Sequence, residues 1–323
     1  MKKGIALLLI LGLLLSLGAC QMTEKPGDAG EKPEEPAATT TAPTTEATKP
    51  PITWMTFPED RQLTAQQYFV FDCETAEFLV ISGEESERIY PASVTKLFTA
   101  YVANQFLNPD REITVDTAMD YVYPGSSVAE LKKGDVITPR RLVEGMLLPS
   151  GNDAAYVLAI GAKGSPEAFV EEMNAQAKLL GMTGSHFANP DGIHEENHYM
   201  TFRDLALLGM LALEDPIIME YAAVASETVT IPNGSATVSG GGATAATGDT
   251  HEWKNTNALI HKDSEYYCPY AIGLKTGQTP SAGSCLLSAF EYDGSTYIIG
   301  VFGCPQVDDR FADTLQLFNS TVG

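Results

Sequence analysis

The sequence predicts an α+β fold, with an antiparallel sheet of about five strands formed by both chain ends and a mostly helical lobe between them. Short runs of alternating apolar residues occur near residue 70 and again after residue 227, and such runs are typical of β-strands. Longer apolar segments suited to helices fill the region between these runs. Because strands occur at both ends of the domain, we expect them to join into one sheet.

The first part of the domain predicts two strands and then a series of helices. The strands, Tyr68–Cys73 and Glu77–Ile81, flank a turn in "QYFVFDCETAEFLVI". The long apolar segment "SVTKLFTAYVANQFL" predicts a helix, and short strands around Gly134 lead into a second one. Further helices are expected in "DAAYVLAIGA", "PEAFVEEMNAQAKLLGM" and "TFRDLALLGMLALED".

The pattern returns to strands after Glu227. Strands are expected in "TVTI", "YAIGLKTGQ", "SCLLSAFEYDG" and "STYIIGVFG", and a closing helix in "DRFADTLQLFN". The segment from Ser235 to Asp249 is low in complexity, and we expect it to form a flexible insertion.

A separate N-terminal segment precedes the domain, which we expect to span residues 64–323. Two lysines and an uncharged run from Gly4 to Ala19 predict a secretory signal over residues 1–19, because the run is too short to span a bilayer comfortably. The end of this run, "LGAC", resembles the lipobox of bacterial lipoproteins, in which Cys20 would carry the lipid. An ordinary signal peptide with a chance cysteine is the alternative.

Residues 20–63 are rich in proline, threonine and glutamate, which predicts a flexible tether between a lipid and the domain. The protein would then be extracytoplasmic and held by its N-terminal lipid on the outer face of the cytoplasmic membrane.

Charge and cysteine content limit the possible functions. The formal net charge is −22, which argues against nucleic acid as a partner because phosphates require clustered lysine and arginine. Four cysteines fall in the domain, at positions 73, 268, 285 and 304, without any C-x-x-C pair, so a zinc ribbon or thioredoxin-like chemistry is not indicated. Export permits disulfides, but the spacing leaves open whether any pair forms.

The segment "PASVTKLFTAYVANQFL" contains a candidate nucleophile and base. Lys96 is the single charged residue between Ala92 and Leu107, so burial should lower its pKa and make a neutral amine accessible. Ser93 precedes it by three residues, which places the hydroxyl and the amine on one face of a helix. The alternative is a helix-capping serine beside a lysine whose amine reaches solvent.

Two later triplets could complete such a site. Ser150-Gly151-Asn152 is expected in a turn between two helices, and its alternative role is an N-cap. Lys275-Thr276-Gly277 is expected at the end of an apolar strand, where a glycine allows a ligand close to the backbone. Its alternative role is a charge that protects a strand edge. Each triplet is a weak signal alone, and the ordered set is a strong one.

The three motifs, in this order, resemble those of the serine penicillin-recognising enzymes. Several longer stretches resemble the D-alanyl-D-alanine carboxypeptidases among the low-molecular-mass penicillin-binding proteins (serine peptidase family S11), over about residues 68–318. These stretches are "YPASVTKLFTAYVA", "LLPSGNDAAYVLA", "FVEEMNAQAKLLGMTGSHFANPDGIHEENHYMT", "NTNALI" and "GLKTGQTPSAGSC". The resemblance implies a β-lactamase/transpeptidase-like fold and hydrolysis of peptidoglycan stem peptides, with inhibition by β-lactams and no cofactor or metal.

The resemblance also implies a role for each motif. Lys96 would take the proton of Ser93, which attacks the carbonyl between the two terminal D-alanines and forms an acyl-enzyme. Ser150 would pass a proton to the leaving D-alanine. The remaining residues would bind substrate. Asn152 would bind the amide of the acyl peptide, and Lys275 and Thr276 of the K-T-G triplet would bind the terminal carboxylate. The backbone N–H groups of Ser93 and Gln278 would bind the oxyanion.

Two alternatives to a carboxypeptidase follow from the same motifs. Class A β-lactamases share them but carry an E-x-x-L-N loop and an aspartate in the middle of the second motif. This sequence has no such loop and has Gly151 at that position, so slow release of penicillin is expected. The other alternative is a non-catalytic wall-binding lipoprotein.

Residues 194–198 fit the zinc-protease pattern H-E-x-x-H, which requires both histidines on one face of a helix. The preceding "NPDGI" favours a turn, and Thr201 with Asp204 forms a capping box that begins the next helix only after His198. We therefore expect a loop here and no metal site.

Overall fold

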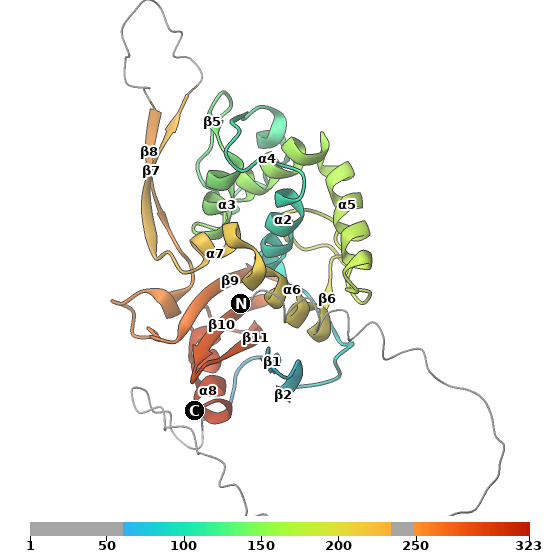
Figure 1. Ribbon diagram of the computed structural model, residues 1–323, viewed down its shortest axis with the longest axis vertical. Helices are drawn as coiled ribbons and strands as arrows, with labels where there is room; N and C mark the ends of the chain where they lie inside the picture. Colours follow the sequence, from blue (N-terminus) through green and yellow to red (C-terminus); the bar gives the residue numbers. More distant parts are fainter. Residues whose placement is uncertain (1–60, 234–247) are drawn as a thin grey trace, which may run out of the picture. The chain divides into compact units, whose positions relative to one another are not determined.

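The computed structural model describes residues 61–233 and 248–323, and its centre is a five-stranded antiparallel sheet (Figure 1). The strand order β2-β1-β11-β10-β9 places the two N-terminal strands beside the three C-terminal ones. The prediction of one sheet formed by both chain ends is therefore confirmed. The strands are β1 (Gln67–Asp72), β2 (Glu77–Ile81), β9 (Ala271–Thr279), β10 (Gly283–Tyr292) and β11 (Ser295–Cys304).

Both faces of the central strands are covered. The C-terminal helix α8 (Asp309–Thr321) packs on β10 and β11, and Phe318 on this helix stacks on Phe290 of β10 with ring centroids 4.5 Å apart. Helix α6 (Phe202–Glu214) also contacts both strands. Because both faces are buried, β10 and β11 are almost continuously apolar and lack the alternation of a half-exposed strand.

The helical lobe is built around α2 (Thr95–Asn104), of whose ten residues eight are buried. This helix contacts five others, and Figure 1 shows it in the middle of the lobe. Side-chain caps fix several helix starts in this lobe, as at Thr138 and Ser165, where a proline follows the cap. The remaining helices around it, besides α6, are α3 (Pro139–Leu147), α4 (Asn152–Lys163), α5 (Pro166–Leu179) and α7 (Pro216–Ala222).

A long hairpin runs along the side of the helical lobe. Strand β7 (Ser226–Pro232) pairs along its full length with β8 (Gly248–Lys254) (Figure 1). The expected insertion over residues 235–249 is wrong at its C-terminal end, because Gly248 and Asp249 pair with Pro232 and Ile231 of β7. Residues 235–247 lie outside the described residues.

Short strands and turns connect the larger elements. Strand β3 (Arg88–Ile89) pairs with β6 (Met200–Thr201), and β4 (Ile113–Thr114) pairs with β5 (Val136–Ile137). Of the short strands expected around Gly134, the one after the glycine is confirmed as β5, whereas the one before it is wrong, because residues 127–133 form no strand. Two turns of 3-10 helix complete this part of the chain, η1 (Ala92–Val94) and η2 (Thr117–Tyr121), and η3 (Ala258–Ile260) follows the hairpin.

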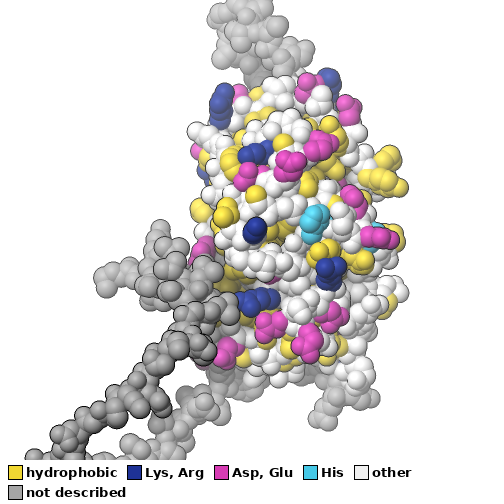
Figure 2. Space-filling view, turned by 90° about the vertical axis from the view of Figure 1, so that its right-hand side faces the viewer, with side chains coloured by type: hydrophobic (Ala, Val, Ile, Leu, Met, Phe, Trp, Pro, Cys, Tyr) yellow, Lys and Arg dark blue, Asp and Glu magenta, His cyan; other side chains and the backbone are white. Residues whose placement is uncertain are grey.

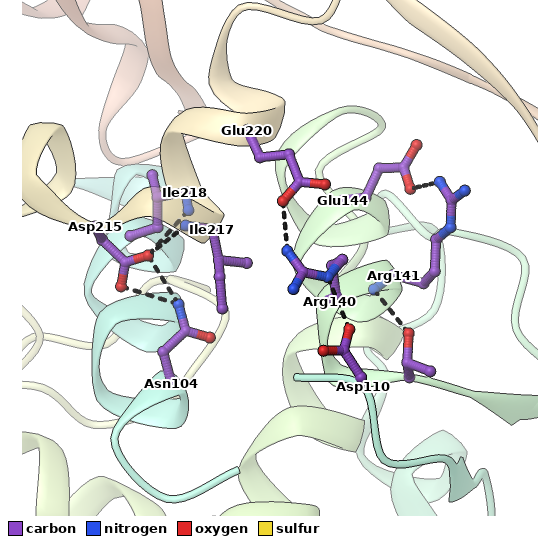
Figure 3. A network of polar contacts seen from close by, with 10 residues as sticks. Asn104, Asp110, Arg140, Arg141, Glu144, Asp215, Ile217, Ile218 and Glu220 are labelled. Atoms are coloured by element: carbon purple, nitrogen blue, oxygen red, sulfur yellow. Dashed lines mark hydrogen bonds and ion pairs between the residues drawn. The ribbon is translucent and has the colours of Figure 1, made fainter. Parts of the chain in front are cut away.

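Polar side chains link the ends of several helices of the lobe (Figure 3). Arg140 on α3 contacts Asp110 through Nε at 3.0 Å and also pairs with Glu220 on α7. Asp215 caps α7 through the backbone N–H of Ile217 and accepts a hydrogen bond from the Asn104 amide at the end of α2. These contacts hold the ends of α2, α3 and α7 together.

The described part of the chain contains neither a disulfide nor a helix suited to span a membrane. All four of its cysteines are free, and Cys268, Cys285 and Cys304 are buried. Burial raises the pKa of the Cys285 thiol to about 11, so it is a neutral core residue. None of the described helices is both long and apolar enough to cross a bilayer.

Candidate active site

The predicted nucleophile and base are in direct contact. Ser93 lies in η1 and Lys96 in the first turn of α2, so the expected single helix over residues 93–107 is a 3-10 turn followed by an α-helix that ends at Asn104. The Nζ of Lys96 lies 2.7 Å from the Oγ of Ser93. The three-residue spacing therefore brings the amine to the hydroxyl, as predicted.

Lys96 is fully buried and anchored by a distant loop. Its Nζ donates a second hydrogen bond to the backbone carbonyl of Asp191 at 2.7 Å. Burial lowers its pKa to about 8, although the carboxylates of Asp191 and Asp153 act in the opposite direction. At pH 7 about one amine in ten would be neutral at such a pKa. A base with this pKa suits proton abstraction near neutral pH.

The backbone before Ser93 is held in an unusual conformation. Ala92 has φ 48°, in the left-handed region that non-glycine residues seldom occupy. Gly192 packs closely against this residue: a Cβ on Gly192 would lie 2.0 Å from the carbonyl oxygen of Ala92. The loop that holds Lys96 thus also packs directly against the residue before the nucleophile.

The K-T-G triplet lies against the same turn. A Cβ on Gly277 would lie 2.7 Å from the Pro91 carbonyl oxygen and 3.1 Å from the Ser93 backbone nitrogen. Strand β9 can approach the nucleophile this closely only because residue 277 lacks a side chain. The neighbouring Gln278 is exposed and pairs with Ser284 of β10.

Lys275 is buried without a carboxylate partner in the described part of the chain. Its Nζ donates to the backbone carbonyl of Thr276 at 3.1 Å. Burial lowers its pKa well below the ordinary value, and the nearby positive charges of Lys96 and Arg310 act in the same direction. A bound carboxylate would reverse this effect by favouring the charged amine. The site is therefore suited to an anion.

Arg310 was not predicted as a site residue. It lies on α8, is 5% exposed, and donates from Nη1 to the Gly277 carbonyl oxygen at 3.1 Å. Its Nε is buried and has no hydrogen-bond partner among the described residues. The segment "DRFADTLQLF" gives no sign of this role, since an arginine in the first turn of a C-terminal helix is ordinarily exposed. Arg310 adds a second cation behind the K-T-G strand.

The S-G-N triplet forms the predicted turn between α3 and α4. Ser150 and Asn152 are both buried, and Ser150 has φ 62°. The Asn152 backbone N–H donates to the Ser127 carbonyl at 2.9 Å, which ties the turn to a neighbouring loop. Helix α4 packs on α2, and the next residue, Asp153, is close enough to favour the charged form of Lys96. The S-G-N turn thus leads into a helix that packs against the one carrying Lys96.

Gly151 cannot be replaced by a larger residue in this conformation. A Cβ there would lie 2.7 Å from the Gly145 carbonyl oxygen and 2.8 Å from the Ala129 backbone nitrogen. The adjacent Asp153 instead supplies a buried carboxylate, which accepts backbone hydrogen bonds from Ala129 and Leu131. The aspartate that class A β-lactamases carry in the middle of this motif therefore has no room here.

The H-E-x-x-H sequence lies in a loop, as predicted. The predicted capping box is also present, because the Asp204 backbone N–H donates a hydrogen bond to Thr201 Oγ1. His198 is buried and its Nε2 lies 2.8 Å from Thr95 Oγ1, while His194 packs edge-on against Tyr90. Burial lowers the pKa of His198 to about 3, so it is neutral. In the described residues, no three His, Cys, Asp or Glu side chains are grouped to hold a metal ion.

A serine in contact with a buried lysine, with two further buried basic side chains, Lys275 and Arg310, in the same region, is an arrangement typical of serine acyl-transfer enzymes. The family model described as D-alanyl-D-alanine carboxypeptidase, Peptidase S11, matches residues 54–306. The chain therefore belongs to the D-alanyl-D-alanine carboxypeptidases of serine peptidase family S11, a family characteristically inhibited by β-lactams.

Individual relatives agree with this assignment. The chain is 35% identical over 240 residues to the D-alanyl-D-alanine carboxypeptidase of Streptomyces sp. strain K15, covering 70% of this chain and 77% of that protein. It is 33% identical over 268 residues to DacC of Escherichia coli, covering 80% of this chain and 61% of that protein. The crystal structure of the Streptomyces K15 DD-transpeptidase superposes with a TM-score of 0.72 at 29% identity, covering 81% of this chain and 98% of that one.

Proposed function

We propose that this protein is a lipid-anchored carboxypeptidase that removes the terminal D-alanine from peptidoglycan stem peptides through an acyl-enzyme on Ser93. The contact of 2.7 Å between Lys96 Nζ and Ser93 Oγ carries the proposal. Neutral Lys96 accepts the Ser93 proton as the oxygen attacks the carbonyl between the two D-alanines.

The remaining motifs handle the charges of this reaction. The backbone N–H groups of Ser93 and Gln278 stabilise the oxyanion, and Asn152 binds the amide of the acyl peptide. Ser150 passes the proton to the departing D-alanine, and water then releases the shortened peptide. The close approach of Gly277 to the Ser93 backbone nitrogen supports the oxyanion site.

The terminal carboxylate of the substrate binds at the cationic end of the site. Lys275 and Thr276 contact it directly, and Arg310 behind Gly277 strengthens the positive potential there. Two buried basic side chains, Lys275 and Arg310, form no salt bridge within the described part of the chain, which supports this assignment. The bound carboxylate itself stabilises the charged form of the Lys275 amine.

The decisive experiment is mass spectrometry of the protein after incubation with benzylpenicillin. The wild type should gain the mass of one penicilloyl group and the Ser93→Ala variant none, and the wild type should release D-alanine from a stem-peptide mimic. Rapid turnover of benzylpenicillin would instead indicate a β-lactamase. A wild type without adduct or D-alanine release would indicate a wall-binding protein without chemistry.

The N-terminal anchor needs its own test. We propose that Cys20 carries the lipid and that residues 20–63 tether the domain outside the cell, because "LGAC" follows an uncharged run. Metabolic labelling with a fatty acid should mark the wild type, and the Cys20→Ser variant should lose the label and leave the membrane fraction. Equal labelling of both proteins would contradict the proposal.

A further inference from the structure

The threonine of the K-T-G triplet is in contact with a second hydroxyl, from a residue that has no role in the reaction described above. The Oγ1 of Thr256 lies 2.5 Å from the Oγ1 of Thr276. Thr276 is 4% exposed, whereas Thr256 is exposed to solvent. Thr256 lies just after strand β8 and was not predicted as a site residue. The two hydroxyls therefore form a pair between the proposed carboxylate site and the surface.

The backbone of Thr256 is fixed by contacts to both the second and the third motif. Its N–H donates to the Leu148 carbonyl at 3.2 Å, at the end of α3 and two residues before the S-G-N triplet. The residues on either side of it, Asn255 and Asn257, are buried. Asn257 donates from Nδ2 to the Gly273 carbonyl of β9 at 3.3 Å, on the strand that carries the K-T-G triplet. The Thr256 hydroxyl is thus presented to Thr276 from a well-anchored position.

The direction of the hydrogen bond between the two hydroxyls determines what Thr276 can offer to a ligand. A hydroxyl has one proton to donate and two lone pairs that accept. The Nζ of Lys275 already donates to the Thr276 oxygen, at 3.5 Å. If Thr276 also gave its proton to Thr256, it would present only a lone pair to a carboxylate and repel it. If Thr256 donates instead, the Thr276 proton remains free for the carboxylate.

Short-range donors of this kind matter because the charge of the whole chain does not attract an anionic substrate. The formal net charge is −22, which opposes the long-range approach of a carboxylate. Figure 2 shows one face of the molecule, on which basic and acidic side chains are interspersed. Recognition of a terminal carboxylate therefore depends on the donors inside the site and on the direction in which their protons point.

We propose that Thr256 is a positioning residue for the substrate carboxylate: its hydroxyl donates to Thr276 and thereby directs the Thr276 proton at the carboxylate. The inference rests on the proposed function and adds a residue that sets its preference for a free C-terminal carboxylate. The arrangement requires a hydroxyl at position 256 and no particular side-chain shape. Serine should therefore replace Thr256, and valine should not.

The test compares two peptides that differ only at the C-terminus, Nα,Nε-diacetyl-L-Lys-D-Ala-D-Ala and its C-terminal amide. Thr256→Val keeps the side-chain shape and removes the hydroxyl. It should lower kcat/KM on the acid about tenfold, the size of one hydrogen bond to a charged group, and leave the amide within about twofold of the wild type. Thr256→Ser should keep the wild-type ratio between the two peptides.

The hairpin offers a matched control, because it contains another pair of threonine hydroxyls. The Oγ1 atoms of Thr230 and Thr250 lie 3.1 Å apart on β7 and β8, and both side chains are exposed. Thr250→Val removes this pair and should leave kcat/KM on both peptides unchanged. Thermal unfolding of each variant checks that it remains folded.

Three results would overturn the role of Thr256. An equal loss on both peptides in Thr256→Val would show that the residue only supports the structure of the site. No loss on either peptide would show that the hydroxyl is not needed, and the same loss in Thr256→Ser would show that the hydroxyl is not the cause. The wild type separates these results from failure of the proposed function. If it neither forms a penicilloyl adduct nor releases D-alanine, the proposed function itself is overturned.

Discussion

The two buried lysines of the site occupy opposite electrostatic environments. Lys96 lies near the carboxylates of Asp191 and Asp153 and beside a hydroxyl, whereas Lys275 lies near two cations, Lys96 and Arg310. Burial lowers the pKa of both. In the proposed function this difference lets one residue type serve two purposes: Lys96 would exchange a proton with Ser93, and Lys275 would gain its charge partner from the substrate.

The largest expected effect comes from removing the Lys96 amine. Lys96→Met should lower the rate of acylation by benzylpenicillin by about 10²–10⁴-fold, since a positioned general base contributes of that order. The rate is measured by quenched mass spectrometry, and thermal unfolding checks that the variant remains folded. A folded variant with a rate within tenfold of the wild type would show that another group takes the Ser93 proton.

Lys275→Met should have a smaller effect that depends on the substrate. The kcat/KM for a peptide ending in D-Ala-D-Ala should fall by about 10–100-fold, the value of one hydrogen bond to a charged group. A peptide with a terminal amide lacks the carboxylate, so the variant and the wild type should hydrolyse it at similar rates. A loss of equal size on both peptides would contradict the assignment of Lys275 to the carboxylate.

The asymmetry between the lysines was only partly visible in the sequence. The strands follow from their alternating or continuous apolar residues, and the contact of Ser93 with Lys96 follows from a spacing of three residues. The anchoring of Lys96 by Asp191 could not be predicted, because it joins residues 95 positions apart through a loop whose path depends on tertiary packing. For the same reason Arg310, 33 positions from Gly277, gave no local signal.

A similar limit applies to the hairpin. Strand β8 reads "GDTHEWK" and alternates only weakly, since its one buried histidine and one buried tryptophan stand among exposed polar residues. No short hairpin turn in the sequence predicts its pairing with β7, because a long connection separates the two strands. The sequence therefore predicted β7 and placed part of β8 in the insertion.

The pH dependence of acylation tests the environment of Lys96 more finely. With a pKa of about 8, the acylation rate should rise with pH and level off above that value, because only the neutral amine accepts the Ser93 proton. The Asp191 carboxylate raises this pKa, so Asp191→Asn should move the inflection to lower pH. The rate constant for benzylpenicillin acylation is measured between pH 6 and 9. An inflection that moves upward, or does not move, would exclude an electrostatic role of Asp191 at Lys96.

The smallest effect is expected at Arg140, which forms ion pairs in an exposed setting and not a buried one. Its side chain pairs with Asp110 and Glu220, which are both substantially exposed (Figure 3). Water therefore screens these charges, whereas Lys96 and Lys275 are buried away from water. Arg140→Ala should lower the free energy of unfolding by less than about 1 kcal/mol, measured by urea denaturation, and leave penicillin acylation unchanged. A loss of several kcal/mol would show that the network between α3 and α7 is coupled to the core. A change in acylation at constant stability would show that the arrangement of these helices reaches the S-G-N turn, which directly follows α3.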